Sequence, residues 1–136
     1  MEKVLEYRVP YADVDQMSVV YYANYLIYFE QGRNEFLRKK GFTYFEMEKI
    51  GVMLPVIEAK CQYFKPAKYD DLLHIKSELS EVNGVRLKMS CEICSEDGNV
   101  LASGYTWHVI VDKDTGKPCR PPEHLKQFLN SITTPK

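Results

Sequence analysis

Long apolar runs and strong net charge are both missing from this sequence. The first residues, MEKVLEYRVPY, hold no apolar stretch of signal-peptide length, and no segment approaches the ~18–20 apolar residues of a membrane-spanning helix. The 18 Lys and Arg residues nearly balance the 19 Asp and Glu residues, which leaves a formal net charge of −1. This net charge argues against a polyanion-binding surface as the main function, and local basic patches remain possible. We therefore expect a cytoplasmic protein with no membrane span and no nucleic-acid partner.

Cysteine is scarce as well: the sequence has only four. In the reducing cytoplasm we expect these cysteines to be free thiols. Cys91 and Cys94 form a CEIC pattern that resembles metal or redox motifs. The segment 85–94 alternates strictly between apolar and polar residues, however, and residues three apart on a strand point to opposite faces. The two thiols cannot readily share a metal or a disulfide there. We expect no metal site and no cofactor.

Internal repeats and low-complexity segments are also absent, and the length suits one domain over residues 1–136. A three-to-four-residue period predicts a long helix over 23–40. Shorter helices are expected over 42–50 and 121–129, and strands over 4–9 (near a sheet edge), 56–64, 72–82, 85–94 and 100–111. Turn signals at Asn83–Gly84 and Glu96–Asn99 join the later strands into hairpins. This order indicates an α+β fold in which an antiparallel sheet wraps around the long helix.

The expected long helix carries an aromatic stripe that should be largely buried. The stripe consists of Tyr25, Phe29, Gly32 and Phe36, and it is widened by Leu26 and Leu37. Gly32 costs roughly 1 kcal/mol relative to Ala inside a helix, and a close approach to another backbone would explain it. Glu30 and Arg33 lie three apart on this helix and can form a surface ion pair.

Two carboxylates, Asp13 and Asp15, lie shortly before this helix. Asp often bonds to its own nearby backbone in turns, and Asp13 suits that role better. Asp15 is followed by no charged residue until Glu30, so we expect a poorly solvated carboxylate that serves as base or nucleophile. The helix should begin near Tyr22, and free N–H groups at a helix start can stabilise an oxyanion. A carboxylate beside such donors indicates acyl-group hydrolysis.

The segment YADVDQMSVVYYANYLIYFEQGRNEFL resembles the signature of the 4-hydroxybenzoyl-CoA thioesterase-type hotdog family. FKPAKYDDLLHI and VDKDTGKPCRPPE resemble later parts of the family pattern, so the similarity extends over roughly residues 3–130. The resemblance implies a hotdog fold, with about five curved strands around a central helix. It also implies homodimers or homotetramers, sites at the subunit interface and coenzyme A thioesters as substrates. Asp15 would be the catalytic nucleophile or general base, and the Tyr22 amide would face the thioester carbonyl.

Further substrate contacts follow from the same resemblance. The motif residues concerned are Ser18, which replaces the family's glycine, Val20, Tyr21 and Asn24. The phosphates of coenzyme A call for basic residues at the mouth of the site. Arg86 and Lys88 on a strand are candidates, as are Lys117 and Arg120 in a turn, although plain solvated charge is an equal alternative for each pair.

Three function hypotheses are compatible with these observations. An acyl-CoA thioesterase is favoured, and a non-catalytic module that binds acyl-CoA or an acyl-carrier protein is the main alternative, because a fold does not fix a function. A dehydratase on the same fold would use a catalytic histidine. The three histidines, His74, His108 and His124, all lie outside the signature segment, and none stands beside a Ser or Cys in a hydrolase motif.

Overall fold

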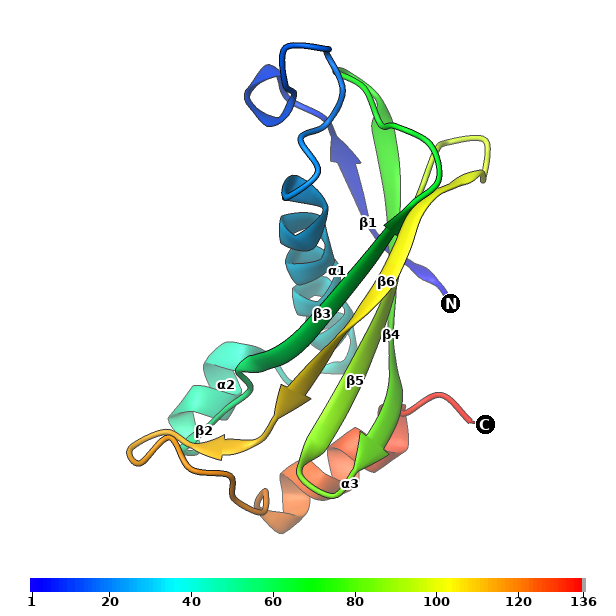
Figure 1. Ribbon diagram of the computed structural model, residues 1–136. Coiled ribbons are helices and arrows are strands. Elements are labelled where there is room, and N and C mark those ends of the chain that lie inside the picture. The colour runs from blue at the N-terminus through cyan, green and yellow to red at the C-terminus, as the bar shows by residue number, and fades with distance from the viewer. Residues whose placement is uncertain (136) are drawn as a thin grey trace.

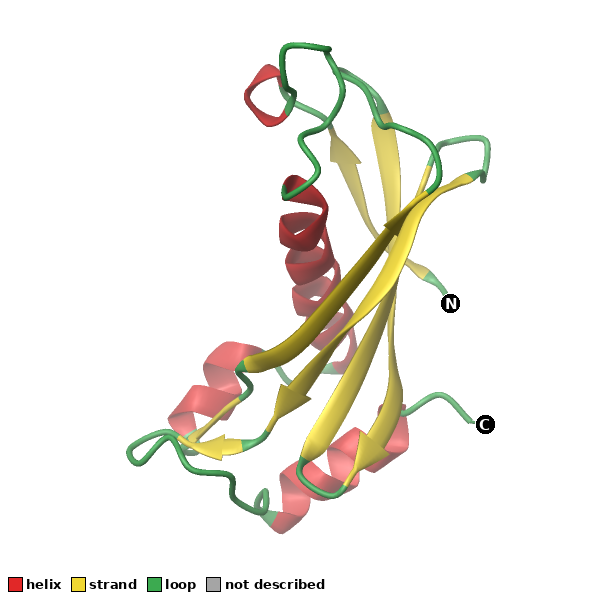
Figure 2. Cartoon of the chain, in the orientation of Figure 1, coloured by secondary structure: helices red, strands yellow, loops and turns green. Residues whose placement is uncertain are grey.

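One long helix lies against one face of an antiparallel sheet (Figure 1, Figure 2). The structure is a computed structural model that describes residues 1–135. The elements in chain order are β1 (Lys3–Arg8), the 3₁₀ turn η1 (Tyr11–Asp13), α1 (Asn24–Lys40), α2 (Tyr44–Lys49), β2 (Val52–Met53), β3 (Val56–Tyr63), β4 (Leu72–Asn83), β5 (Arg86–Cys94), β6 (Val100–Val109), β7 (Val111–Asp112) and α3 (Glu123–Ile132). The predicted α+β class with an antiparallel sheet is confirmed.

The main sheet has five strands in the order β1-β4-β5-β6-β3, and all neighbours are antiparallel. The prediction that β1 lies at an edge is confirmed, and β3 forms the other edge. β4 and β5 form the predicted hairpin, with Gly84 at φ +63° in its turn. The separate pair β2–β7 was not predicted, because two-residue strands carry no periodic signal.

The aromatic stripe of α1 packs on the sheet as predicted. Tyr25, Phe29, Gly32 and Phe36 are buried, but Leu26 is 39% exposed and does not belong to this face. A Cβ at Gly32 would lie 2.7 Å from Cγ2 of Ile75 on β4. The glycine therefore allows the close approach that was expected, although its neighbour is a side chain rather than a backbone.

The two ends of α1 differ in how they are capped. Gly41 ends the helix in the left-handed conformation, φ +102°, and its N–H donates to the carbonyls of Leu37 and Arg38. Ala23 precedes the first turn and offers no side-chain cap. The N–H groups at the start of α1 are therefore not satisfied by a capping side chain.

Cys91 and Cys94 are buried on β5, and both are free thiols. The Cys91 thiol lies under α1, 3.8 Å from the carbonyl oxygen of Phe29, so it serves as a packing residue. Within residues 1–135, no group of three His, Cys, Asp or Glu side chains is placed to hold a metal ion. None of the helices in this part of the chain is long and apolar enough to cross a membrane.

Candidate active site

The loop before α1 folds into a tight hairpin at one end of the molecule (Figure 1). The N–H of Asp15 donates to the carbonyl of Val19 at 2.9 Å, and the N–H of Ser18 donates to the carbonyl of Asp15 at 3.0 Å. Ser18 has φ +63°, a left-handed conformation that costs a residue with a Cβ on the order of 1 kcal/mol. The serine thus adopts a backbone shape that glycine would adopt freely.

The two aspartates of this loop have different partners. Oδ1 of Asp15 accepts a 2.8 Å bond from the N–H of Met17, which is an Asx turn. Oδ2 of Asp13 accepts the hydroxyls of Tyr7 at 2.8 Å and Tyr28 at 2.7 Å. The expectation that Asp13 forms the Asx turn is therefore wrong: among residues 1–135 its carboxylate accepts two tyrosine hydroxyls from other elements and no backbone N–H. Asp15 is exposed within one chain, so the expected poor solvation is not seen there.

Asp15 opens onto a pocket of about 320 Å³ between the hairpin, the start of α1 and the end of β3. The pocket is lined by Asp15, Val19, Val20, Tyr22, Tyr25, Tyr63, Phe64, Lys65 and Pro66. Three predicted site residues, Asp15, Val20 and Tyr22, are brought together here. The Val20 N–H donates to the carbonyl of Ala67 at 2.8 Å, which attaches the hairpin to the segment after β3.

Backbone donors are available at the start of α1. The N–H of Asn24 donates to the carbonyl of Tyr21, but the N–H groups of Tyr22 and Ala23 have no hydrogen-bond partner among the described residues. The hydroxyl of Tyr63 donates to the Tyr22 carbonyl at 2.9 Å. Burial raises the pKa of Tyr63 to about 12, so this hydroxyl stays protonated at neutral pH. Asp15 and Tyr22, whose N–H has no partner among the described residues, thus line one pocket.

Comparison with known proteins identifies the family. Residues 9–129 match the model of the thioesterase-like superfamily. The chain belongs to this superfamily. It is 41% identical over 126 residues to the acyl-CoA thioesterase YbgC of Haemophilus influenzae, with 92% of each chain covered. It is 30% identical over 118 residues to the acyl-CoA thioester hydrolase YbgC of Escherichia coli O6:H1, covering 87% of this chain and 88% of the relative.

A solved structure agrees with this family assignment. A DHNA-CoA thioesterase from Staphylococcus aureus superimposes with a TM-score of 0.88 at 29% identity, over 94% of this chain and 88% of that one. The predicted hotdog fold and the resemblance to hotdog thioesterases are confirmed by these comparisons.

The other residues expected from the signature segment lie around the pocket without lining it. Ser18 shapes the hairpin turn. The ring of Tyr21 packs against Tyr22, with centroids 4.7 Å apart. The Asn24 side-chain amide donates to the Asp13 carbonyl at 2.9 Å, so it supports the loop from the helix.

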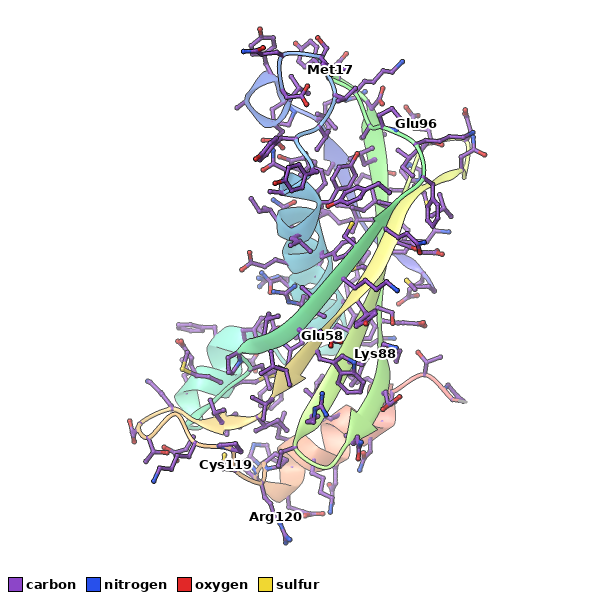
Figure 3. All side chains as sticks on the ribbon, in the orientation of Figure 1. Met17, Glu58, Lys88, Glu96, Cys119 and Arg120 are labelled. Carbon is purple, nitrogen blue, oxygen red and sulfur yellow. The ribbon has the colours of Figure 1, made fainter. Side chains whose placement is uncertain are left out.

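The two basic candidates on β5 lie elsewhere in this thioesterase-like chain. Arg86 stacks over Trp107 at 4.9 Å and Lys88 over Tyr105 at 4.6 Å. Figure 3 shows Lys88 well away from Met17, which marks the hairpin. Within one chain the structure does not bring Arg86 or Lys88 to the Asp15 pocket.

The end of β3 supplies pocket residues that sequence reasoning missed. Tyr63, Phe64, Lys65 and Pro66 line the pocket about fifty residues after Asp15 in the chain. Their position depends on the β3–β6 register, in which Tyr63 pairs with Ala102. The only available signal was the similarity of FKPAKYDDLLHI to the family pattern.

The histidines stand apart from the pocket. His108 is almost fully buried on β6, with Nε2 2.8 Å from Thr106 Oγ1 and Nδ1 2.9 Å from the Leu54 carbonyl. Burial lowers the pKa of His108 to about 4, so its ring is neutral at pH 7. His74 on β4 lies 3.7 Å from Glu6 on the edge strand β1. No histidine lines the Asp15 pocket.

A second cavity of about 400 Å³ lies near the start of β3. Its walls include Arg33, Asn34 and Tyr44, together with apolar residues such as Leu54. The Glu30–Arg33 ion pair expected on the helix is not formed among the described residues, and both side chains line this cavity. Nε of Arg33, Oδ1 of Asn34 and the hydroxyl of Tyr44 are buried without a hydrogen-bond partner in this part of the chain.

Proposed function

We propose that this protein is an acyl-CoA thioesterase that hydrolyses acyl-coenzyme A to a carboxylic acid and free coenzyme A. The observation that carries the proposal is that Asp15 and Tyr22, which lies two residues before α1 and whose N–H has no partner among the described residues, line one pocket. The superfamily and the names of the relatives agree with this reaction class.

Asp15 is the proposed catalytic carboxylate. Its Oδ1 is engaged by the Met17 N–H, whereas Oδ2 accepts no hydrogen bond from residues 1–135. As a nucleophile, Oδ2 would attack the thioester carbonyl, release the coenzyme A thiolate and leave an anhydride that water then hydrolyses. As a general base, it would take a proton from the attacking water while the C–S bond breaks. Both routes consume one water per thioester.

The Tyr22 N–H is the proposed oxyanion donor. A backbone amide aimed at the developing negative charge typically contributes 10²–10³-fold in rate. The Tyr63 hydroxyl donates to the Tyr22 carbonyl. Tyr22 is therefore fixed from both the helix and the sheet. Lys65 at the pocket wall is the proposed contact for a phosphate of coenzyme A.

We further propose that the working unit is a homodimer joined through β3. This edge strand has eight residues, and apolar side chains on it remain uncovered, with Val56 45% exposed and Ile57 50% exposed. Proteins normally protect such long apolar edges from open pairing. A second copy paired antiparallel to β3 would cover it and continue the sheet. A dimer of such dimers would form the homotetramer, the other assembly that the family resemblance implies.

This pairing would place the second cavity of one subunit next to the Asp15 pocket of the other. The Asp15 pocket includes the end of β3, and the second cavity includes Leu54 and Pro55 just before its start. Because antiparallel pairing sets the start of one strand beside the end of the other, the second cavity of one subunit would adjoin the Asp15 pocket of its partner. We propose that the acyl group enters this cavity. The unpartnered groups of Arg33, Asn34 and Tyr44 favour an acyl group with a polar end.

Thiol release from short-chain, long-chain and aryl acyl-CoAs tests the reaction. We expect Asp15→Asn to lower kcat at least ~100-fold while the fold is kept, because Asn can still accept from the Met17 N–H. Asp112→Asn is the matched control, since Asp112 Oδ1 also accepts backbone N–H bonds in a turn, at the opposite end of the molecule. A fully active Asp15→Asn variant would refute the assignment. No release from any substrate, with tight acyl-CoA binding, would favour the binding-module alternative.

Light scattering tests the dimer. Ile57→Glu introduces a charge on the exposed edge strand and should shift the protein to monomers. Phe45→Glu is the control, since Phe45 is 65% exposed on α2 and lines neither of the two cavities. If Ile57→Glu leaves the mass of the assembly unchanged, the β3 interface is wrong.

A further inference from the structure

Asp13 is the best-connected residue of the loop before α1, and the proposed chemistry does not use it. Its Oδ2 accepts both the Tyr7 hydroxyl at 2.8 Å and the Tyr28 hydroxyl at 2.7 Å. Tyr7 comes from β1 and Tyr28 is buried on α1. The two rings also touch, with centroids 4.9 Å apart. One carboxylate oxygen therefore ties the loop to the edge of the sheet and to the helix.

The backbone of Asp13 reaches the helix start directly. Its carbonyl accepts the Tyr21 N–H at 3.0 Å and the Asn24 side-chain amide at 2.9 Å. The Tyr21 carbonyl in turn accepts the Asn24 N–H at 2.9 Å. The C=O and N–H of a planar trans peptide point in opposite directions. Holding the Tyr21 carbonyl therefore also fixes the direction of the Tyr22 N–H.

Asp13 is also close to Asp15, with only Val14 between them. The Tyr21–Asp13 and Asp15–Val19 bonds are consecutive links of the same hairpin. A shift of Asp13 would move the Asp15 carboxylate and the Tyr22 amide, which are the two groups that must act on the same thioester carbonyl.

We propose that Asp13 is a positioning residue that sets the Asp15 carboxylate and the Tyr22 amide in fixed relation, with Tyr7 and Tyr28 as its anchors. The inference rests on the proposed function. A misplacement of about 1 Å at a reacting centre can cost ~100-fold in rate, so positioning of this kind has a large effect on kcat.

The chemistry of the cluster supports a purely structural use of this carboxylate. Burial and the bond to Asp13 raise the pKa of Tyr7 to about 12, and they raise the pKa of Tyr28 as well. Both hydroxyls therefore remain donors throughout a normal assay range. Two donors thus occupy Oδ2, and Asp13 is not among the residues that line the Asp15 pocket.

The test compares Asp13→Ala with Asp13→Asn. The alanine variant loses both tyrosine bonds, and we expect kcat to fall roughly 10–100-fold with KM changed less than about three-fold. Asparagine keeps an oxygen with two acceptor sites, so it should restore kcat to within about five-fold of the parent. Tyr7→Phe, which removes one anchor at the edge of the sheet, is the milder variant if Asp13→Ala fails to fold. It should lower kcat about three-fold or more. Asp112→Ala is the control for loss of a loop carboxylate and should leave kcat unchanged.

A second readout does not need turnover. In amide NMR spectra, Asp13→Ala should shift or broaden the Asp15 and Tyr22 resonances, and Asp13→Asn should return them near the parent positions. Unchanged kcat and unchanged amide signals in folded Asp13→Ala would overturn the inference. A parent without thiol release would refute the proposed function alone, and the amide signals would still decide whether Asp13 positions the loop.

Discussion

Gly104 on β6 connects the packing of the sheet to the candidate site. A Cβ built at this position would lie 1.9 Å from the carbonyl oxygen of Lys60 and 3.0 Å from the Cα of Cys61, both on the backbone of β3. Normal contact would require these strands to separate by more than an ångström. The β3–β6 ladder would then lose two or three hydrogen bonds of about 1 kcal/mol each, in addition to the overpacking strain. We expect Gly104→Ala to destabilise the protein by about 3 kcal/mol or more.

The same change should reach the pocket, because β3 ends at Tyr63 and Lys65 follows two residues later. Thermal unfolding should show a Tm lower by roughly 10 °C for a domain of this size. Thiol release by the folded fraction should fall, since the Tyr63 bond to the Tyr22 carbonyl depends on the position of β3. Ser103→Ala on the same strand is the control and should change stability by less than about 0.5 kcal/mol. A Tm within 2 °C of the parent for Gly104→Ala, a margin of about 0.5 kcal/mol, would show that the close strand contact is not rigid.

Three further predictions follow from single sites. Ser18→Gly should relieve the left-handed strain at φ +63° and raise the unfolding free energy by up to about 1 kcal/mol, with kcat within two-fold of the parent. The pKa of His108 is lowered to about 4 in the folded state, so the unfolded chain binds more protons between about pH 6.5 and pH 4. Stability should therefore fall by roughly 3 kcal/mol as the pH drops through that window, and His108→Gln should flatten this slope in urea titrations. Lys65→Gln should raise the KM for acyl-CoA about five-fold and weaken the salt dependence of KM. The double variant Arg86→Gln, Lys88→Gln should alter KM less than about two-fold. The reverse pattern would move the phosphate contact to β5.

Local periodicity predicted most of the fold. The helix expected over 23–40 is α1, Asn24–Lys40, and the strand expected over 72–82 is β4, Leu72–Asn83. These elements are long enough for the spacing of their buried residues to show on its own. Leu26 was placed wrongly because the stripe was drawn too wide, and spacing alone cannot show where a helix face leaves the sheet.

The candidate site was only partly readable for a related reason. Asp15 and Tyr22 lie within eight residues of each other, so a hairpin and a helix start suffice to bring them together. Tyr63 and Lys65 join them only through the register of β3 on β6, and register is a property of the whole sheet. The second cavity depends in the same way on how α1, α2 and β2 meet.

The two aspartates show what chain position cannot reveal. Asp13 and Asp15 are the same residue type two positions apart, and the sequence assigned the turn to the wrong one. Their roles differ because Tyr7 and Tyr28, from other elements, occupy one oxygen of Asp13, while Asp15 keeps Oδ2 free beside the pocket. The same chemical change should therefore have opposite results: Asp15→Asn should abolish most turnover, and Asp13→Asn should preserve most of it. Equal losses in the two variants would mean that the carboxylate charge matters at both positions, and that the division between a reacting and a positioning aspartate is wrong.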